Sequence, residues 1–405
     1  MIKLVFILLV LLLFGCKGNE NRKFSYTREE IESLHLKQTQ MLHVFVDSVV
    51  NVDLNKFLGN KHFDFESLIK SIHTIPLETT DESLISNIYK VVMTDSHVYI
   101  HDDFKGGGIA IFLNNGKFVK RISHGGGPGE LTMLYDIAYD SKNNHLLAYQ
   151  HPFLLYYTAN GEYIKQSKLP FGFYNFVTLA NGYLFKTLDG SGNKHLEELS
   201  DCTVLVTDTN FSLKHAGFQS IGVVEHYGGY SYLGDTGEAI WITNNNNDTV
   251  FHYNKALQRL EAAYVMNYED KKIPSDYWLL PSQAFHKKLS QNDCYYYIGE
   301  YFETDSHQVF FLRNDYRRTQ TVVYRDKRTG KMFGGSEARF NSHEIPAIAF
   351  PKATFKDSFV SIHYPQKSDS LLIRSKRLLI QDKKKIMQLK EDDNPVLFLF
   401  QLDVF

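Results

Sequence analysis

A short segment that recurs along the sequence constrains the fold of this chain more than any other feature. Residues 115–120, Asn-Gly-Lys-Phe-Val-Lys, return 45 positions later as residues 160–165, Asn-Gly-Glu-Tyr-Ile-Lys. Looser copies follow at residues 211–214, 256–260 and 329–333. Asn-Gly between two apolar runs is typical of a tight β-hairpin, because both positions tolerate positive φ. The sequence therefore predicts one kind of hairpin, repeated along the chain.

Short apolar runs flank these hairpins and predict strands. Phe and Tyr are abundant, with 30 and 25 copies against 2 Trp, and such residues favour half-buried pleated surfaces. No long helical period interrupts the series, so the sequence predicts an all-β fold. The clearest predicted strands lie at residues 98–101, 109–112, 118–122, 146–149 and 154–157.

A period of 40 to 50 residues with four short strands in each unit is typical of a β-propeller, in which radial packing leaves only short, protected sheet edges. A large β-sandwich, the alternative, would not repeat its hairpins at one interval. Residues 75–405 leave room for six or seven units, and the insertions between Tyr264 and Tyr301 favour six. We therefore expect a six-bladed β-propeller over residues 72–405.

Residues 1–15 have the parts of a bacterial signal peptide, and Cys16 follows them directly. Lys3 supplies a positive charge, and residues 4–14 form an apolar run too short for a transmembrane helix, which needs about 20 residues. The sequence at residues 13–16, Leu-Phe-Gly-Cys, resembles the lipobox of bacterial lipoproteins. We expect Cys16 to be lipidated and to hold the protein on a membrane through its acyl chains. An ordinary cleaved signal with an incidental cysteine is the alternative.

Residues 16–71 are expected to form a lipidated tether followed by a partly helical prelude. Thr27 and Glu30 have the spacing of a capping box, which begins a helix. A loosely helical spacing of apolar residues extends this prediction to about residue 46, through Ile31, Leu34, Met41, Leu42 and Phe45.

Five further segments, in their order along the chain, resemble the six-bladed β-propeller lipoproteins of Bacteroidetes, a family akin to NHL-repeat propellers. The resemblance covers about residues 70–405 and implies a fold and an outer-membrane location, but no established activity. His124, in a position that is usually basic, is a departure from the pattern. The segments are residues 75–80, 126–130, 247–251, 302–305 and 393–397.

The two ends of the predicted propeller are expected to meet. Residues 75–77 would open the first blade, and residues 396–405 would supply a late apolar strand. Propellers commonly close their ring by pairing strands from the two ends of the chain, which would explain such a strand so close to the C-terminus.

The glycine-rich loop around residues 124–130 is one candidate ligand-binding site. Gly126, Gly127 and Gly129 let backbone amides approach a ligand closely, and with Glu130 they would form an anion-binding nest. No Gly-Lys-Ser/Thr follows, and no βαβ unit surrounds the loop, so neither nucleotide-binding motif is present. The alternative is a tight crossing between blades that Glu130 caps.

Glycine-spaced tyrosines form a second candidate site. Tyr227, Tyr230 and Tyr232 would line a carbohydrate-binding funnel, because sugar rings stack on aromatic faces. The alternative is that such aromatic residues fill the space between blades.

Metal and nucleophile motifs are scarce. Asn247 and Asp248 are weak calcium candidates, because calcium prefers oxygen ligands, and a simple turn is the alternative. Among the 17 histidines only His97 and His101 have the His-x-x-x-His spacing, on a segment predicted as a strand rather than a helix, and no Gly-x-Ser-x-Gly elbow occurs. Cys202 and Cys294 either form one disulfide or remain buried free thiols.

Taken together, these features favour a binding protein over an enzyme. The formal net charge of −2 gives no reason to expect a nucleic-acid partner. We expect a propeller anchored to the outer membrane that binds a glycan, a peptide or an outer-membrane protein through its central funnel. The sequence does not decide between the periplasmic and the surface face of that membrane. No cofactor is expected apart from calcium. The rival hypothesis is a metal-dependent lyase or lactonase with ligands from separate blades, and a third is a structural scaffold.

Overall fold

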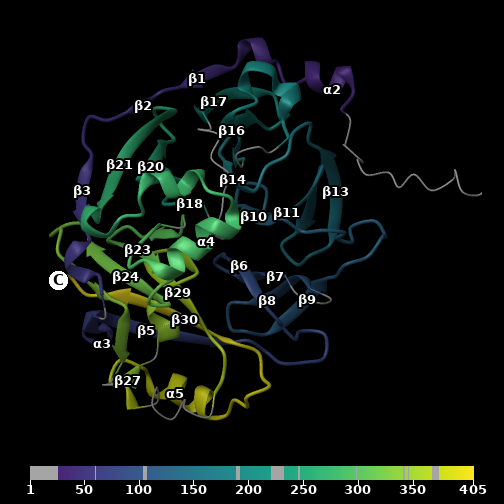
Figure 1. Ribbon diagram of the computed structural model, residues 1–405. Coiled ribbons are helices and arrows are strands. Elements are labelled where there is room, and N and C mark those ends of the chain that lie inside the picture. The colour runs from purple at the N-terminus through teal and green to yellow at the C-terminus, as the bar shows by residue number, and fades with distance from the viewer. Residues whose placement is uncertain are drawn as a thin grey trace, which may run out of the picture.

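Six blades, each with four antiparallel strands, surround a common axis in the computed structural model (Figure 1), and further strands add to the sheets of two of them. The structure describes residues 26–59, 61–103, 107–187, 192–219, 232–244, 247–297, 299–340, 343–344, 346–366 and 374–405. This arrangement is the predicted six-bladed β-propeller. Blades 1 to 3 are β6 (Ile88–Met93), β7 (His97–Asp102), β8 (Gly108–Leu113) and β9 (Phe118–Ile122); β10 (Asp136–Asp140), β11 (His145–Gln150), β12 (Phe153–Thr158) and β13 (Tyr163–Lys168); and β14 (Asn175–Leu179), β15 (Gly182–Lys186), β16 (Cys202–Asp208) and β17 (Leu213–Gln219). Blades 4 to 6 are β18 (Leu233–Asp235), β19 (Ala239–Asn244), β20 (Asn247–Asn254) and β21 (Arg259–Asn267); β22 (Tyr301–Glu303), β23 (His307–Asn314), β24 (Thr319–Asp326) and β25 (Met332–Gly335); and β28 (Ala353–Phe355), β29 (Ser358–His363), β30 (Val396–Leu402) and β5 (Ile69–Pro76).

The recurring hairpins occupy one equivalent place in the ring. All five copies join the third strand of a blade to its fourth strand, in blades 1 to 5. Gly116 and Gly161 adopt φ of 87° and 84°, and their amides donate to Leu113 O and Thr158 O at 2.8 and 2.9 Å. Blade 6 has no copy, because its third and fourth strands come from opposite ends of the chain.

Ring closure follows the prediction. The C-terminal strand β30 pairs antiparallel with β5, from Val396 opposite Pro76 to Leu402 opposite Ile69. Strand β5 is thus the outermost strand of blade 6, and the two chain ends are joined by a backbone ladder rather than by a loop.

The N-terminal prelude begins as predicted and then departs from the prediction. Thr27 Oγ1 accepts the amide of Glu30, and the Glu30 carboxylate accepts the amide of Thr27, which completes the capping box of α2 (Arg28–Glu32). Beyond this helix the expected helical pattern is wrong. The chain forms a short 3-10 helix, η1 (Leu36–Gln38), and then three strands, β1 (Gln40–Leu42), β2 (Val44–Phe45) and β3 (Val50–Asp53).

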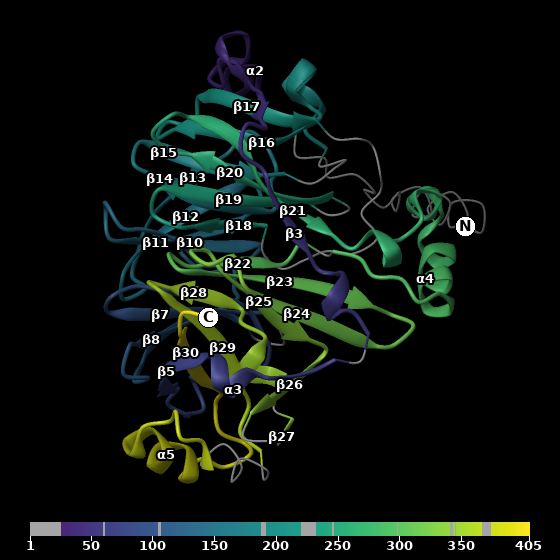
Figure 2. The ribbon, with the colours of Figure 1, turned by 90° about the vertical axis from the view of Figure 1, so that its left-hand side faces the viewer.

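These three strands lie against the rim of the propeller (Figure 2). Strand β1 pairs in parallel with β17, and strands β2 and β3 pair in parallel with β21. Residues 40–53, here called the N-terminal belt, therefore cover the outer edges of blades 3 and 4 instead of forming a free tether. Leu42 and Val52 are buried in this contact, and the free backbone edges of the two blades favour strand over helix.

The segment between the belt and blade 6 is also packed onto the rim. It contains η2 (Asn55–Phe57), β4 (His62–Asp64) and α3 (Phe65–Leu68). Strand β4 pairs in parallel with β26 (Glu337–Phe340), which also pairs with β27 (His343–Glu344).

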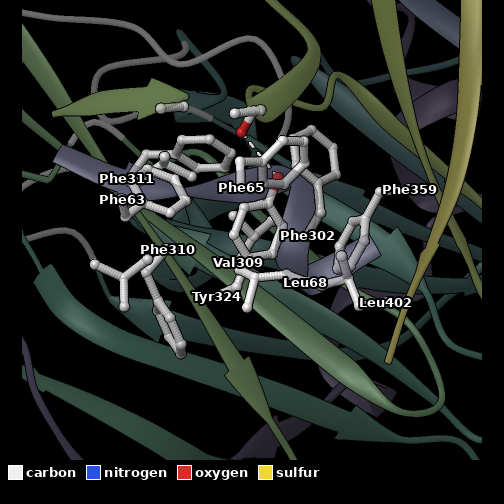
Figure 3. Close-up of a cluster of buried hydrophobic side chains, with 14 of the residues drawn as sticks. Phe63, Phe65, Leu68, Phe302, Val309, Phe310, Phe311, Tyr324, Phe359 and Leu402 are labelled. Atoms are coloured by element: carbon white, nitrogen blue, oxygen red, sulfur yellow. Dashed lines mark hydrogen bonds between the residues drawn. The ribbon is translucent and has the colours of Figure 1, made fainter. Parts of the chain in front are cut away.

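Aromatic side chains fill the space between blades. Phe65 is fully buried, with ring centroids 5.5 Å from Tyr324 and 5.3 Å from Phe400 (Figure 3). Tyr324 satisfies its hydroxyl by donating to Ala349 O at 2.8 Å. The N-terminal segment thus contributes directly to the core between blades 5 and 6.

The longest helix within the described residues belongs to an insertion between blades 4 and 5. This helix is α4 (Ser282–Gln291), and it follows two 3-10 helices, η4 (Glu269–Lys271) and η5 (Ser275–Leu279). None of the helices in the described ranges is long and apolar enough to cross a membrane. The remaining helical segments are η3 (Lys194–Leu199), η6 (Pro346–Ala349) and α5 (Ile380–Met387).

Candidate binding site

A cavity of about 500 Å³ lies on the axis of the propeller. Its wall is built from the innermost strands of all six blades, β6, β10, β14, β18, β22 and β28. Each of these strands pairs with only one neighbour within its blade, so its second backbone edge faces the axis. The wall therefore offers amide and carbonyl groups as well as side chains.

Alternation of strand direction sorts the connections between two faces of the disc. Turns after the first and third strands of each blade lie on one face, and all other connections lie on the opposite face. The repeated hairpins share the first face, whereas α4 belongs to the second. Figure 2 shows α4 standing off that second face.

Polar side chains link the innermost strands of neighbouring blades. Lys90 Nζ of blade 1 lies 2.7 Å from Asp136 Oδ1 of blade 2, and the other Asp136 oxygen accepts the Phe176 amide of blade 3 at 3.0 Å. Burial raises the pKa of Asp136, and Lys90 opposes that shift. Asn175 repeats the pattern, since its Oδ1 accepts the Tyr232 amide of blade 4 at 3.2 Å.

A buried carboxylate marks the wall at blade 5. Glu303 Oε2 accepts the Tyr301 hydroxyl at 2.7 Å and lies 3.0 Å from His252 Nε2, while Lys327 Nζ lies 2.6 Å from Oε1. Burial alone would raise the pKa of Glu303, but His252 and Lys327 outweigh it and hold the pKa at about 2. The carboxylate is therefore ionised and fully paired, which suits a fixed wall between blades 4 and 5.

Two tyrosines meet at the end of the channel where the innermost strands begin. The hydroxyls of Tyr89 in blade 1 and Tyr174 before blade 3 are 2.5 Å apart, so they reach past the start of blade 2. The ring of Tyr174 lies 5.8 Å from that of Tyr232. Burial, followed by Tyr174, raises the pKa of Tyr89. This cluster of three tyrosines therefore lies at the α4 face of the disc, at the start of the innermost strands.

The opposite mouth of the channel carries exposed charges. Asp235 pairs with Lys255 at 2.5 Å, and Lys356 pairs with Asp95 at 2.7 Å. Asp305 is also exposed at this mouth. A ligand that enters from this side therefore meets carboxylates and ammonium groups before it reaches the axial wall.

The predicted glycine loop lies between blades 1 and 2, away from the cavity wall. The Glu130 carboxylate folds back and accepts the Gly127 amide at 2.7 Å, and a Cβ on Gly125 would lie 2.0 Å from the same carboxylate. Gly129 adopts φ of 78° and packs beside Tyr163. The loop thus has the geometry of a capped crossing, and ligand binding by Gly126, Gly127, Gly129 and Glu130 stays a prediction.

The predicted tyrosine site is only partly within the described residues. Tyr227 and Tyr230 lie outside them. Tyr232 is buried, and Lys186 Nζ lies 5.9 Å from its ring centroid. Its ring belongs to the tyrosine cluster at the channel end rather than to an exposed platform.

Asn247 and Asp248 begin β20 and have protein partners. Asn247 Oδ1 accepts the Thr249 amide at 3.0 Å, which is the geometry of a turn, and Asp248 contacts Lys272 and the Tyr268 hydroxyl. Among the described residues, no group of three His, Cys, Asp or Glu side chains could hold a metal ion. Calcium binding by Asn247 and Asp248 therefore stays an untested prediction.

Two of the three cysteines lie within the described residues. Cys202 and Cys294 are buried free thiols, as one of the two predicted alternatives required. Burial, followed by Asp293, raises the pKa of Cys294 to about 11, so its thiol is protonated at neutral pH. Cys16, the predicted lipidation site, lies outside the described residues.

The sequence contains one signal for the channel mouth that the motif search missed. Thr-Asp-Ser-His occurs at residues 94–97 and again at 304–307, after the innermost strands of blades 1 and 5. In each copy the serine hydroxyl lies 2.8 Å from the histidine Nδ1. Each histidine Nε2 then reaches the next blade, at Asn160 Oδ1 (2.9 Å) and Asp403 O (3.0 Å). An alignment of the blades by this motif would have placed Asp95 and Asp305 at equivalent positions, on the same face of the disc.

Comparison with known families agrees with this architecture. Residues 49–401 match the family described as Domain of unknown function (DUF4934). The chain belongs to this family. The DUF4934 match begins within the N-terminal belt and ends in β30, so it includes both strands that close the ring.

This DUF4934 chain is also similar to solved structures. A protein of Bacteroides fragilis that is named as an exported protein is 18% identical, with a TM-score of 0.69, and the match covers 88% of this chain and 100% of that one. A protein of unknown function from Bacteroides caccae is 12% identical, with a TM-score of 0.36, over 61% of this chain and 81% of that one. No curated protein matches. The first likeness supports the propeller fold.

Proposed function

We propose that this protein is an exported lipoprotein of the outer membrane whose propeller binds a glycan, a peptide or a protein partner at its axis. The observation that carries the proposal is the axial cavity, to which all six blades contribute. Its volume of about 500 Å³ lies within the usual range for small-molecule sites, about 300–1,000 Å³. The named export of the Bacteroides fragilis protein supports the location.

Filling the cavity tests the proposal. Small glycans and short peptides would be screened for a rise in Tm, which a ligand selective for the folded state produces. Thr354 lines the cavity in the innermost strand of blade 6, so Thr354→Phe should remove the rise given by any axial ligand. Thr209→Phe, in an exposed hairpin of blade 3, is the matched control and should retain it. Equal rises in both variants would contradict axial binding.

A metal-dependent lyase or lactonase is the rival proposal. No observation within the described ranges favours it. Elemental analysis of the purified protein distinguishes the two, because stoichiometric zinc or iron would support the enzyme, whereas calcium is compatible with both.

A further inference from the structure

A second, larger pocket lies on the α4 face and shares one lining residue, Lys352, with the axial cavity. Its volume is about 810 Å³, and its wall comes from α4, from the hairpin between β23 and β24, and from the residues that precede β22 and β28. Figure 1 shows α4 over the middle of the disc, and Figure 2 shows it standing off the face. The insertion between blades 4 and 5 therefore builds a wall that the propeller itself would lack.

A small core of its own holds α4 in place. Phe285 and Leu289, four residues apart, are buried together with Ile273, Cys294 and Tyr296. The Trp278 ring packs 5.0 Å from Phe285. Because residues at this spacing share one helix face, the other face of α4 is free to border the pocket, and it carries Lys287.

The pocket has an excess of positive charge. Its two carboxylates already have partners: Glu300 lies 3.4 Å from Lys352 Nζ, and Asp315 accepts from Arg313 at 2.8 Å. Lys287 and Arg318 form no ion pair with any acidic side chain in the part of the chain that the structure describes. These two cations come from different elements and face one hollow, so their fields add there.

The chemistry of the lining selects the kind of anion. Every side chain that lines the pocket is polar or charged, including Ser290, Asn314, Thr319 and Gln320. Ser290 is exposed and Gln320 is half-buried, so both can hydrogen-bond to the hydroxyls of a ligand. We propose that the pocket binds an acidic saccharide, whose carboxylates or sulfates contact Lys287 and Arg318 and whose hydroxyls contact Ser290 and Gln320.

Isothermal titration of the intact protein with trigalacturonate tests this assignment, with maltotriose as the neutral saccharide and hexaglutamate as the acidic peptide. We expect trigalacturonate to bind, to bind more weakly as salt is raised, and to exceed both other probes. The Lys287→Gln/Arg318→Gln double variant should weaken binding by about tenfold or more, since charge-assisted hydrogen bonds are the strong ones.

A double variant of equal charge change provides the control. Lys117→Gln/Lys384→Gln removes two exposed lysines on blade 1 and on α5, and it should leave binding unchanged. Melting curves of both double variants should match the unmodified protein, so a loss of binding cannot come from unfolding. Equal binding of maltotriose or hexaglutamate, no binding of trigalacturonate or of a sulfated trisaccharide, or full binding by the Lys287→Gln/Arg318→Gln variant would each overturn the proposal.

Discussion

At the scale of single residues, the contact between Trp241 and Gly234 shows how tightly the ring is packed. A Cβ on Gly234 would lie 2.2 Å from the Trp241 indole, which is held edge-on against Tyr301 and Phe302 at centroid distances of 5.4 and 6.1 Å. Gly234→Ala should therefore lower the free energy of unfolding by about 1–3 kcal/mol through overpacking. Urea unfolding measures this effect. Gly126→Ala is the control, because its Cβ would meet no atom within 4 Å, and an equal loss there would contradict the packing argument.

His101 makes a second prediction at this scale, one of pH dependence. Burial, followed by the charges of Lys90 and His124, lowers the pKa of His101 to about 3, against about 6.5 in an unfolded chain. Between these values the unfolded chain binds a proton that the folded one excludes, so stability falls as the pH drops below about 6.5. Burial also lowers the pKa of His151, His195 and His307, so these residues add to the same pH dependence. A variant that lacks only His101 is therefore needed to measure its share.

His101→Gln removes this titration. The free energy of unfolding of the variant, measured by urea at pH 7.0, 6.0 and 5.0, should fall less steeply than that of the unmodified protein, by up to about 1.4 kcal/mol per pH unit. The window lies above the range in which Glu303, with its pKa at about 2, begins to contribute. Identical slopes would show that the folded protein binds a proton at His101 as readily as the unfolded chain does, and would contradict the lowered pKa.

At the scale of elements, strand β30 closes the ring. It is the third strand of blade 6 and lies between β29 and β5, so its removal leaves both with open backbone edges. Deleting residues 396–405 should therefore unfold the whole domain cooperatively rather than fray one blade. Circular dichroism during heating measures this, and a melting curve like that of the full chain would refute closure through β30.

The elements also show where prediction from sequence succeeded. The hairpins are local, so Asn115-Gly116 and Asn160-Gly161 predicted two of the five, and the spacing of the three looser copies predicted the ring. The belt was not predictable in this way, because Met41 pairs with Ala216, far away in the sequence. The axial site was not predictable for the same reason: Lys90, Tyr139 and Glu303 come from three blades, and only the closed ring brings them to one cavity wall.

At the scale of the whole molecule, the proposed anchor and the proposed binding site lie on different parts of the propeller. The first described residue, Tyr26, lies at the rim, with Lys168 of β13 5.6 Å from its ring centroid and His195 4.7 Å away. Ten peptide links join it to Cys16 and reach about 36 Å at most. A lipid on Cys16 would therefore hold the disc near the bilayer by its rim, and the axial mouth and the α4 face would both stay accessible.

The anchor itself is the last prediction. Cys16→Ala should leave the Tm unchanged, because the described contacts of the propeller begin at Tyr26, yet it should move the protein from the membrane fraction to the soluble fraction of the cell envelope. Cys202→Ala is the matched control, since that thiol is buried in blade 3 and should have no part in attachment. Immunoblots of membrane and soluble fractions measure both variants. A Cys16→Ala protein that stays with the membrane would mean that the propeller or its leader makes the attachment, and the lipid anchor would be wrong.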